Sequence, residues 1–195
     1  MAETDGPVCR ALTWLHSAQT TTGELPAWAS PLDGAEPVWM PDSLKFITAL
    51  ATTSLATIDE PRAVDLVDRS VAFLRTEREP FALWRYWSST NEQFAFTPVD
   101  ADDTACCSMA VATRGDDTTP NVKLLLANRD AEGRFRTWLI PHRGGRGLRW
   151  RRAMRAERRP AIQARRAELW STTEAEPDDV DVVVNANVCR YLGAE

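Results

Sequence analysis

The sequence predicts an all-α fold, an array of helical hairpins in a single domain over residues 1–195. Apolar residues recur three and four positions apart in several segments, the spacing that places them on one face of a helix. No segment shows the sustained apolar–polar alternation that is typical of strands. Trp28, Trp84 and Trp138 lie 56 and 54 residues apart. This interval fits a repeated unit made of a helix pair and an aromatic turn.

The N-terminal half contains three predicted helices. The first spans residues 7–19 and begins at Pro7, where proline is tolerated because the first helical amides have no partner within the helix. Asp42 is expected to cap the second helix, and Pro61 is expected to open the third, which ends near Thr76. The apolar residues of these helices that we expect in the core are Leu12, Leu15, Phe46, Ile47, Leu50, Val64, Val67, Val71 and Leu74.

The C-terminal half contains at least three further helices. An aromatic segment, residues 81–96, is expected to pack as a turn and to lead into a helix over residues 100–113. Another helix begins near Thr119 and places Leu125 in the core. Residues 179–192 are ambiguous, because their valines favour a strand while the glycine that follows is a good helix stop.

Composition limits the classes of function. The formal net charge of −5 argues against nucleic-acid binding by the whole chain. No stretch approaches the ~18 apolar residues that a membrane helix needs. Residues 1–7 are acidic and contain no apolar run, so we expect no signal peptide and a cytoplasmic location. The four cysteines show no metal-ligand spacing, and the adjacent Cys106 and Cys107 are expected in the core.

One segment differs from the rest of the chain. Residues 143–166 contain ten Arg and one Glu. They are interpreted as a basic patch for phosphate or nucleic acid, as a solvated insertion, or as an anomalous stretch produced by reading a GC-rich gene out of frame. Because the segment lacks apolar periodicity, we expect it to pack poorly and to form exposed helix at most.

Three carboxylates lie within four residues in the segment Pro98-Val99-Asp100-Ala101-Asp102-Asp103-Thr104-Ala105. Asp100 can cap the following helix, with Asp102 and Asp103 in its first turn, where the helix dipole favours negative charge. Alternatively, burial and mutual repulsion raise the pKa of at least one carboxyl, which then serves as an acid near neutral pH. Residues 177–181 repeat the arrangement of two acids two positions apart after a proline, so they are a candidate start of an equivalent helix.

The Asp-Ala-Asp-Asp-Thr-Ala segment resembles the acidic motif of the class II terpene cyclases, the squalene–hopene cyclase group. Five further segments are similar to the α/α-barrel repeats of that superfamily, and the last of the five resembles its bacterial members. They are residues 11–15, 19–28, 83–87 and 133–138, together with Val182-Val183-Val184-Asn185-Ala186-Asn187-Val188.

The resemblance implies an acid-initiated cyclisation of a linear isoprenoid. Asp102 matches the proton donor, and Asp100 and Asp103 match the flanking acids that orient it and tune its pKa. Aromatic faces stabilise carbocations without reacting with them. No cofactor is implied and no dedicated metal cluster is visible, although Mg²⁺ would accompany a substrate that carries a diphosphate. The candidate wall residues, for which packing between helices is the alternative role, are Trp84, Tyr86 and Trp87.

The number of predicted helices leaves the function open. A closed α/α toroid needs more than the six or seven helices predicted here, so we expect an incomplete barrel. Such a chain acts as part of a cyclase, with a second chain completing the barrel, or as a non-catalytic hairpin scaffold for an apolar ligand or partner. A remnant of an interrupted gene is the third interpretation. Binding of a polyanion by the arginine-rich segment is the weakest.

Overall fold

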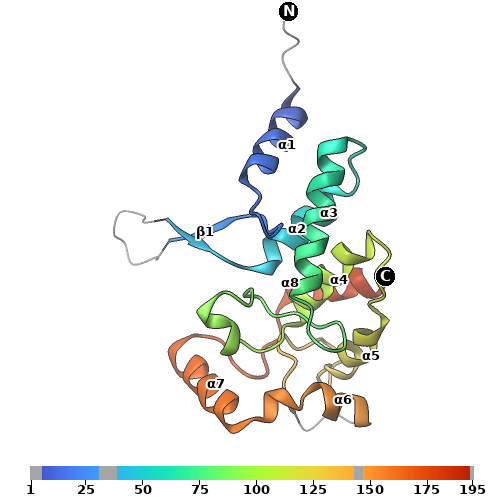
Figure 1. Cartoon of the computed structure of the whole chain (residues 1–195). Helices are drawn as coiled ribbons and strands as arrows, with labels where there is room; N and C mark the ends of the chain where they lie inside the picture. Colours follow the sequence, from blue (N-terminus) through green and yellow to red (C-terminus); the bar gives the residue numbers. More distant parts are fainter. Residues whose placement is uncertain (1–5, 31–38, 143–146, 194–195) are drawn as a thin grey trace, which may run out of the picture.

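A computed structural model of the chain describes residues 6–30, 39–142 and 147–193, and the predicted all-α fold is confirmed (Figure 1). The only sheet among these residues is a two-stranded antiparallel ribbon. In chain order the elements are α1 (Pro7–Ala18), β1 (Ala27–Ala29), β2 (Met40–Asp42), α2 (Lys45–Leu55), α3 (Pro61–Thr76), the 3-10 helix η1 (Glu92–Ala95), α4 (Ala101–Ala112), α5 (Thr119–Ala127), α6 (Gly147–Ala153), the 3-10 helix η2 (Ala156–Arg158), α7 (Pro160–Thr172) and α8 (Val182–Leu192).

Three helices begin at an acidic side chain that accepts hydrogen bonds from free backbone N–H groups. Glu60 caps α3, Asp100 caps α4 and Asp181 caps α8. The ambiguous last segment is helical, and α8 ends at Gly193, whose φ of 68° is the left-handed conformation that glycine adopts easily. These ends follow from local sequence chemistry, because each cap satisfies amides that have no partner within the helix.

The predicted cap of the second helix is wrong. Asp42 lies in β2, and α2 begins after Leu44 without any side-chain cap. Instead, the backbone N–H of Lys45 donates to the carbonyl oxygen of Tyr86 at 2.9 Å. A turn that is distant in sequence thus satisfies the helix start, and the local sequence contains no sign of it.

Helices α2, α4 and α8 form a central layer, and α1 and α3 pack outside it. α4 lies between α2 and α8, α3 packs against both α2 and α4, and α1 packs against α3. Figure 1 shows α6 and α7 together at the opposite end of the molecule from α1. The predicted equivalence of the starts of α4 and α8 is confirmed, but the second cap is Asp181, so the two acidic sequences align with an offset of two residues.

An equivalent hydrogen bond joins each turn to the central helix that follows it in the chain, and this bond defines the repeat. In all three cases a backbone N–H in the turn donates to the side chain four residues after the N-cap of the helix. The donor–acceptor pairs are Leu25–Thr48 (3.0 Å), Trp84–Thr104 (3.2 Å) and Phe135–Asn185 (2.8 Å).

These hydrogen bonds show that the predicted repeat of Trp28, Trp84 and Trp138 is in the wrong register at its middle member. Trp28, Trp87 and Trp138 each follow a donor residue by three positions and are spaced by 59 and 51 residues, whereas Trp84 is itself a donor. The residue two positions before each donor has a positive φ, and in the middle repeat this residue is Ala82, at 57°. An L-residue in this region is strained by about 1–2 kcal/mol, so surrounding contacts must hold the turn.

Most of the predicted core is confirmed, with two errors. Ile47 and Val64 are 43% and 45% exposed. On α2 the buried face holds Thr48, Ala49 and Thr52 instead, because small side chains let α4 approach closely. Buried as predicted are Leu12, Val67, Val71, Leu74 and Leu125, while Leu15, Phe46 and Leu50 are partly buried against this core.

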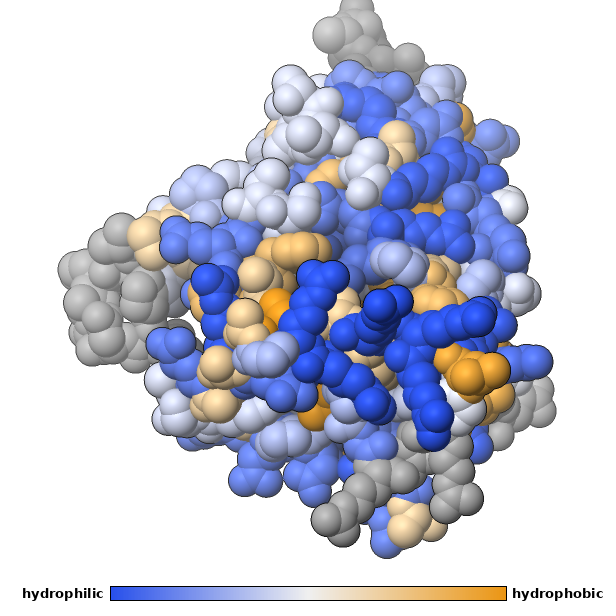
Figure 2. Space-filling model, turned by 60° about the horizontal axis from the view of Figure 1, so that its bottom comes forward, coloured by the Kyte–Doolittle hydropathy of each residue, from blue (hydrophilic) through white to orange (hydrophobic). Residues whose placement is uncertain are grey.

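The arginine-rich segment packs better than predicted. Residues 143–146 lie outside the described residues, but Trp150 and Met154 are 1% and 0% exposed in the second core cluster. Poor packing is therefore wrong for this part of the segment. Figure 2 views the face on which α6 and α7 lie, and long hydrophilic side chains cover most of it. Whether the segment is an insertion stays a prediction.

A buried ion-pair network fixes the same segment to the aromatic turn. Glu157, 2% exposed, accepts hydrogen bonds from Arg85 and Arg166, which are 7% and 5% exposed. Arg85 also pairs with Glu79 at 2.7 Å. Removing one member of such a network costs about 3–5 kcal/mol, because it leaves a buried charge without a partner.

Candidate functional site

The acidic motif lies at the start of α4, between two aromatic turns. The N–H of Asp100 donates to the carbonyl oxygen of Trp84 at 3.2 Å, and that of Ala101 donates to Thr137 at 2.8 Å. The Oδ1 atom of Asp100 accepts from the amides of Asp102 and Asp103 at 2.6 and 3.3 Å. The capping interpretation is therefore confirmed, and the two turns hold the cap inside the protein.

Burial raises the pKa of all three carboxyls, and repulsion within the motif adds to it for Asp100 and Asp103. For Asp100, burial is the largest cause and the charge of Asp102 the next, and its pKa rises to about 7 despite the two amide hydrogen bonds. Asp103, 1% exposed, has a pKa well above its usual value because of burial and then the charges of Asp100 and Asp102. Burial also raises the pKa of Asp102. The motif therefore holds protons that separate aspartates would lose.

Asp102 is the half-buried member of the three and contacts α8. Its Oδ1 atom accepts a hydrogen bond from Nδ2 of Asn187 at 2.7 Å and a weaker one from Sγ of Cys106 at 3.8 Å. Both contacts favour the carboxylate and oppose the pKa-raising effect of burial. Asn187 thus orients Asp102 from a helix that lies 85 residues further along the chain.

Asp103 points into the packed interior. Its Oδ1 atom is buried and has no hydrogen-bond partner among the residues that the structure describes. Lys45 lowers the pKa of Asp103 through its charge, but this amine is itself fully buried and lies 3.3 Å from Oε2 of Glu77. Its Nζ atom also lies 4.8 Å from the centre of the Phe94 ring. The protonated form of Asp103 is the one that fits this environment.

An apolar cavity of about 270 Å³ lies beside the motif. Asp100 is the member of the acidic trio that lines it. Tyr86 and Trp87, two of the three predicted wall residues, also line it, and their rings are 4.7 Å apart in an edge-on arrangement. The complete lining is Tyr86, Trp87, Thr97, Asp100, Trp138, Leu169, Thr173 and Ala175.

Trp84, the third predicted wall residue, lies elsewhere. Its side chain is 0% exposed in the first core cluster, and its Nε1 donates to the carbonyl oxygen of Leu74 at 2.9 Å. Trp138 takes the place that register equivalence assigns, since it lines the cavity and packs 5.7 Å from Trp170 of α7. Trp138 belongs to the repeat-like segment 133–138 of the sequence. Only the register of the turns shows that Trp138 lines the cavity and Trp84 does not.

Sequence reasoning missed two further contributions. Asn187 was part of the 182–188 segment, and nothing in the sequence indicated that it would contact Asp102. Leu169 and Thr173 follow the arginine-rich segment, at the end of α7 and just after it, and nothing in the sequence there indicated a cavity wall. Tyr86 was predicted as a wall residue, and burial and the charge of Asp103 raise the pKa of its phenol, so it stays a hydrogen-bond donor.

Residues 6–30, 39–142 and 147–193 contain neither a cluster of metal ligands nor a helix that could cross a membrane. Within these ranges no three His, Cys, Asp or Glu side chains are placed to share a metal ion. His142 packs its ring against Trp150, with the ring centres 4.8 Å apart. Over the same ranges, every helix is too short or too polar to cross a bilayer.

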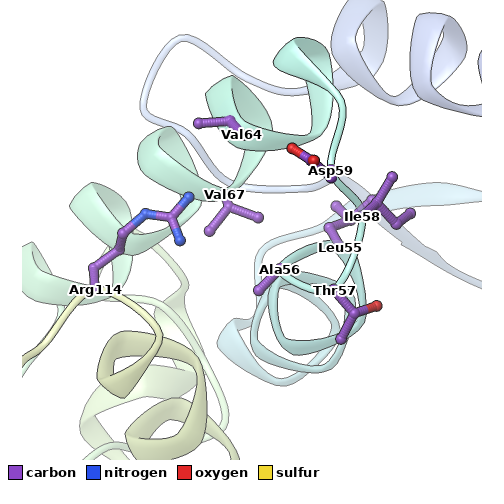
Figure 3. A pocket seen from close by; sticks show the side chains of 8 residues that line it. All are labelled: Leu55, Ala56, Thr57, Ile58, Asp59, Val64, Val67 and Arg114. Atoms are coloured by element: carbon purple, nitrogen blue, oxygen red, sulfur yellow. The ribbon is translucent and has the colours of Figure 1, made fainter.

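A second cavity, of about 210 Å³, lies at the other end of α2 (Figure 3). Its walls come from the end of α2, the connection to α3, and Val64 and Val67 of α3. Its charged lining residues are Asp59 and Arg114, and Arg114 already pairs with Asp68 at 2.5 Å. This cavity lacks the cluster of acids that distinguishes the first, so the first is the candidate functional site.

Comparisons with known proteins give matches to solved structures alone, because no family model and no curated protein matches the chain. Type II terpene cyclase MstE from Scytonema, bound to merosterolic acid A, matches 94% of this chain with a TM-score of 0.50 at 15% identity. The apo form of that enzyme and its complex with geranylgeranyl dihydroxybenzoate both match with a TM-score of 0.49 at 14% identity, again over 94% of this chain. The fold is terpene-cyclase-like.

The likeness has a defined extent. This chain spans 57%, 57% and 56% of those three structures, in the order given. At such low identity it shows the fold alone, and the specific squalene–hopene type stays a prediction.

Proposed function

We propose that this chain catalyses, alone or as part of an assembly, the acid-initiated cyclisation of a linear isoprenoid, with Asp102 as the general acid. The observation that carries the proposal is the clustering of three carboxyls with raised pKa, one of which, Asp100, lines an apolar cavity with aromatic walls. Such a cluster retains a proton near neutral pH, and an apolar wall favours the cation that this proton creates.

Exposure and orientation support Asp102 as the donor. Asp100 and Asp103 are 6% and 1% exposed, whereas Asp102 is half-buried, so a substrate can approach it and solvent can return its proton. Because Asn187 and Cys106 both donate to Oδ1, the transferable proton belongs on Oδ2. Asp100 holds the backbone of Asp102, and burial together with the charge of Asp181 keeps the proton on Asp102 until it is transferred.

The proposed reaction begins with transfer of the Oδ2 proton to the terminal alkene or epoxide of the substrate. The resulting carbocation is attacked by the next double bond of the chain, which closes a ring and moves the positive charge along it. Loss of a proton or addition of water ends the sequence, and Asp102 regains a proton from solvent. Tyr86, Trp87 and Trp138 present aromatic rings to the cavity, and a desolvated cation over such a ring gains about 2 kcal/mol.

Partners and cofactors follow from the same proposal. The substrate is a linear isoprenoid or a similar apolar small molecule, and a second chain completes the barrel around it. No cofactor takes part in the proton transfer, and Mg²⁺ enters only with a substrate that carries a diphosphate. We place the reaction in the cytoplasm of a bacterium, as expected from the sequence.

The deciding experiment compares wild type with Asp102→Asn on a panel of linear isoprenoids, with product analysis by mass spectrometry. The substitution keeps size and hydrogen bonding but removes the acidic proton, so we expect cyclic product to fall by about 10²–10⁴-fold. Asp65→Asn, an isosteric change at a half-exposed carboxylate of α3, is the matched control and should retain full activity. Equal activity in wild type and Asp102→Asn excludes Asp102 as the acid.

A second candidate function is non-catalytic binding of an apolar ligand. It is favoured by the size of the cavity, about 270 Å³, and by its lining, which includes Asp100 but not Asp102, the proposed acid. A fluorescent apolar probe that binds wild type and Asp102→Asn equally, with no product from either, supports this function.

A further inference from the structure

The helical hairpins form three repeats whose turns can be compared position by position. Each repeat contains an outer helix, a turn and a central helix: α1 and α2 in the first, α3 and α4 in the second, α5 and α8 in the third. Every turn contains a second equivalent hydrogen bond, of 2.9 Å, which ends at the carbonyl oxygen just before Leu25, Trp84 or Phe135. The donor–acceptor pairs are Thr20–Glu24, Glu79–Leu83 and Asp130–Arg134.

The outer helices of the later repeats pack against the turn of the repeat before them. The hydroxyl of Ser70 in α3 donates to the carbonyl oxygen of Gly23 at 3.3 Å. Nδ2 of Asn121 in α5 donates to the carbonyl oxygen of Ala82 at 2.7 Å. The two donors occupy the same position of the repeat, and so do the two acceptors. These contacts therefore identify the face of an outer helix that meets the preceding repeat.

The first repeat exposes this face to solvent. One helical turn beyond the donors, the second and third repeats place Phe73 and Leu124, which are 5% and 1% exposed. The same position of α1 holds Trp14, a larger apolar side chain, and Trp14 is 60% exposed. Ala11, at the position of the donors themselves, is exposed as well. A face that is buried twice within the chain thus lies open on α1 and is apolar there.

The central helices show the same difference. Ile47, Asp103 and Val184 each lie three residues after the N-cap of their helix. The charge of Lys45 in α2 acts on Asp103, and Val184 packs in the second core cluster against α4, so this position is directed toward the preceding repeat. Asp103 and Val184 are 1% and 6% exposed, but Ile47 is 43% exposed. Trp14 and Ile47 together are here called the leading face.

The third repeat exposes the opposite face. Ala49, Ala105 and Ala186 each lie five residues after the N-cap of their helix. Ala49 and Ala105 are 0% exposed because the next central helix covers them, whereas Ala186 of α8 is exposed. Val182 and Val183, in the first turn of α8, are exposed as well. These three residues of α8, here called the trailing face, lie where a following central helix would pack.

Apolar end faces are unusual for an array of repeats. In such an array each repeat contacts its neighbours, and the end repeats carry polar outer faces that keep the protein soluble. Here the leading face presents a tryptophan and an isoleucine, and the trailing face presents two valines and an alanine. Within the chain, the equivalents of the leading face in the second and third repeats meet the equivalents of the trailing face in the first and second. The two open faces are therefore complementary through the same repeat geometry.

We propose that the leading face of one protomer docks on the trailing face of a second copy of this chain, which places α2 beside α8 as α4 lies beside α2 within the chain. The contact joins two different faces, so a second contact of the same kind closes a ring of two copies. That two copies suffice rests on the proposed function, in which a second chain completes the barrel. The second chain is then this chain itself, and the barrel consists of two identical halves.

Light scattering of the full chain after size-exclusion chromatography measures the assembly. Wild type should have twice the mass of the chain, and high dilution should return it to a monomer. Ile47→Arg places a charge on the leading face, and Ala186→Arg places one on the trailing face. Each should raise the dimer dissociation constant at least about 30-fold, because burying an unpaired charge in an interface costs as much as losing a hot-spot residue. Leu148→Arg, at an exposed leucine of α6 outside both faces, is the matched control and should change the constant by about twofold at most.

Mixing the two variants tests the head-to-tail arrangement. Ile47→Arg keeps an intact trailing face, and Ala186→Arg keeps an intact leading face. An equimolar mixture should therefore regain one contact and form a dimer that neither variant forms alone. A symmetric interface, in which the same face of both protomers meets, predicts no such recovery. Circular dichroism checks that each variant is folded.

A wild type that stays monomeric at its highest soluble concentration overturns the proposal, and this measurement depends on no variant. Equal loss in Leu148→Arg, failure of the mixture to form a dimer, or growth beyond two copies as the concentration rises overturns it too. Asp102→Asn should assemble as wild type does, since Asp102 contacts α8 of its own chain. A dimer that yields no cyclic product therefore contradicts the proposed function alone, and a monomer that yields cyclic product contradicts the assembly alone.

Discussion

α4 and α8 begin in the same way, yet only α4 begins at a candidate active site. Their caps, Asp100 and Asp181, have φ, ψ values of −108°, 140° and −102°, 143°. Each carboxylate accepts hydrogen bonds from the amides two and three residues further on. The two helices then pack side by side in the central layer. Local geometry therefore does not distinguish them.

The difference lies in what surrounds the first turn. Asp100 is 6% exposed and is followed by two more acids, whereas α8 continues with Val182 and Val183, which are 80% and 56% exposed. Capping needs only a side chain and free amides, but a raised pKa needs burial and neighbouring like charges. The same local structure therefore serves stability in α8 and proton storage in α4.

The largest expected effect is on the pH dependence of stability. In the unfolded chain Asp100 has its ordinary pKa near 3.8, while in the folded protein it is about 7. Between these values the folded state binds more protons, so the free energy of unfolding falls as pH rises from about 4 to 7. The loss from Asp100 is on the order of 4 kcal/mol.

Urea denaturation from pH 4 to pH 9 measures this effect. Asp100→Asn keeps a good cap and removes the buried charge, so it should be more stable than wild type above pH 7 and should show a shallower pH profile. Asp103 contributes the slope that remains. Asp181→Asn should keep the pH profile with only a slightly smaller slope, because the charge of Asp181 is the smallest of the causes that raise the pKa of Asp100. A wild type that gains stability between pH 4 and pH 7 contradicts the assignment of raised pKa values.

The next effect comes from placing acids on α8 at the positions of the motif. Val184 occupies the position of Asp103 and is 6% exposed, while Val183 occupies that of Asp102. Val184→Asp buries a carboxyl without a partner and should destabilise the protein by about 2–4 kcal/mol at pH 7. Val183→Asp should stay within about 0.5 kcal/mol. Equal losses in thermal or urea unfolding would show that burial does not govern the difference.

A smaller effect tests the contact between the two helices. Asn187→Ala removes a hydrogen bond that lowers the pKa of Asp102, so the pKa of that carboxyl rises. The limb of the pH–rate profile on which the acid loses its proton should move to higher pH, and kcat should fall about tenfold because the carboxyl loses its orientation. Cys106→Ala, which removes the weaker 3.8 Å contact, should move the limb less. An unchanged profile in Asn187→Ala would mean that Asn187 has only a packing role.

The smallest effect compares the caps themselves. Asp181→Ala should cost about 1 kcal/mol of stability at pH 5 and only slightly less at pH 8, since it removes a cap and a charge that is the smallest cause of the raised pKa of Asp100. Asp100→Ala should cost a similar amount at pH 5 but little at pH 8, where loss of the cap is offset by loss of a buried charge. Guanidinium unfolding of the two variants at both pH values gives this comparison, and parallel behaviour would contradict it.

Much of the fold could be predicted because it depends on local patterns. The helix starts at Pro7 and Pro61, the cap at Asp100 and the stop at Gly193 are all contained in a few adjacent residues. The errors occurred where the determining partner is distant. Asp42 lost the capping role because the Tyr86 carbonyl satisfies the start of α2.

The candidate site could be predicted only in part for the same reason. Asp100, Asp102 and Asp103 are adjacent in sequence, and so are Tyr86 and Trp87. The other residues of the site come from distant parts of the chain: Asn187 from α8, Trp138 from the next turn, and Leu169 from the end of α7. Periodicity describes one helix at a time and contains no information about which helix lies beside it.

By itself, the sequence determined an all-α chain of hairpins, an acidic helix start and the position of an unusual arginine-rich segment. Only the tertiary structure decided that the acids are buried, that Trp84 packs in the core while Trp138 faces the cavity, and that Glu157 draws the arginine-rich segment into the fold. The physical reason is that caps and helical faces arise from short-range backbone chemistry. Burial and electrostatic coupling depend on which distant surfaces meet.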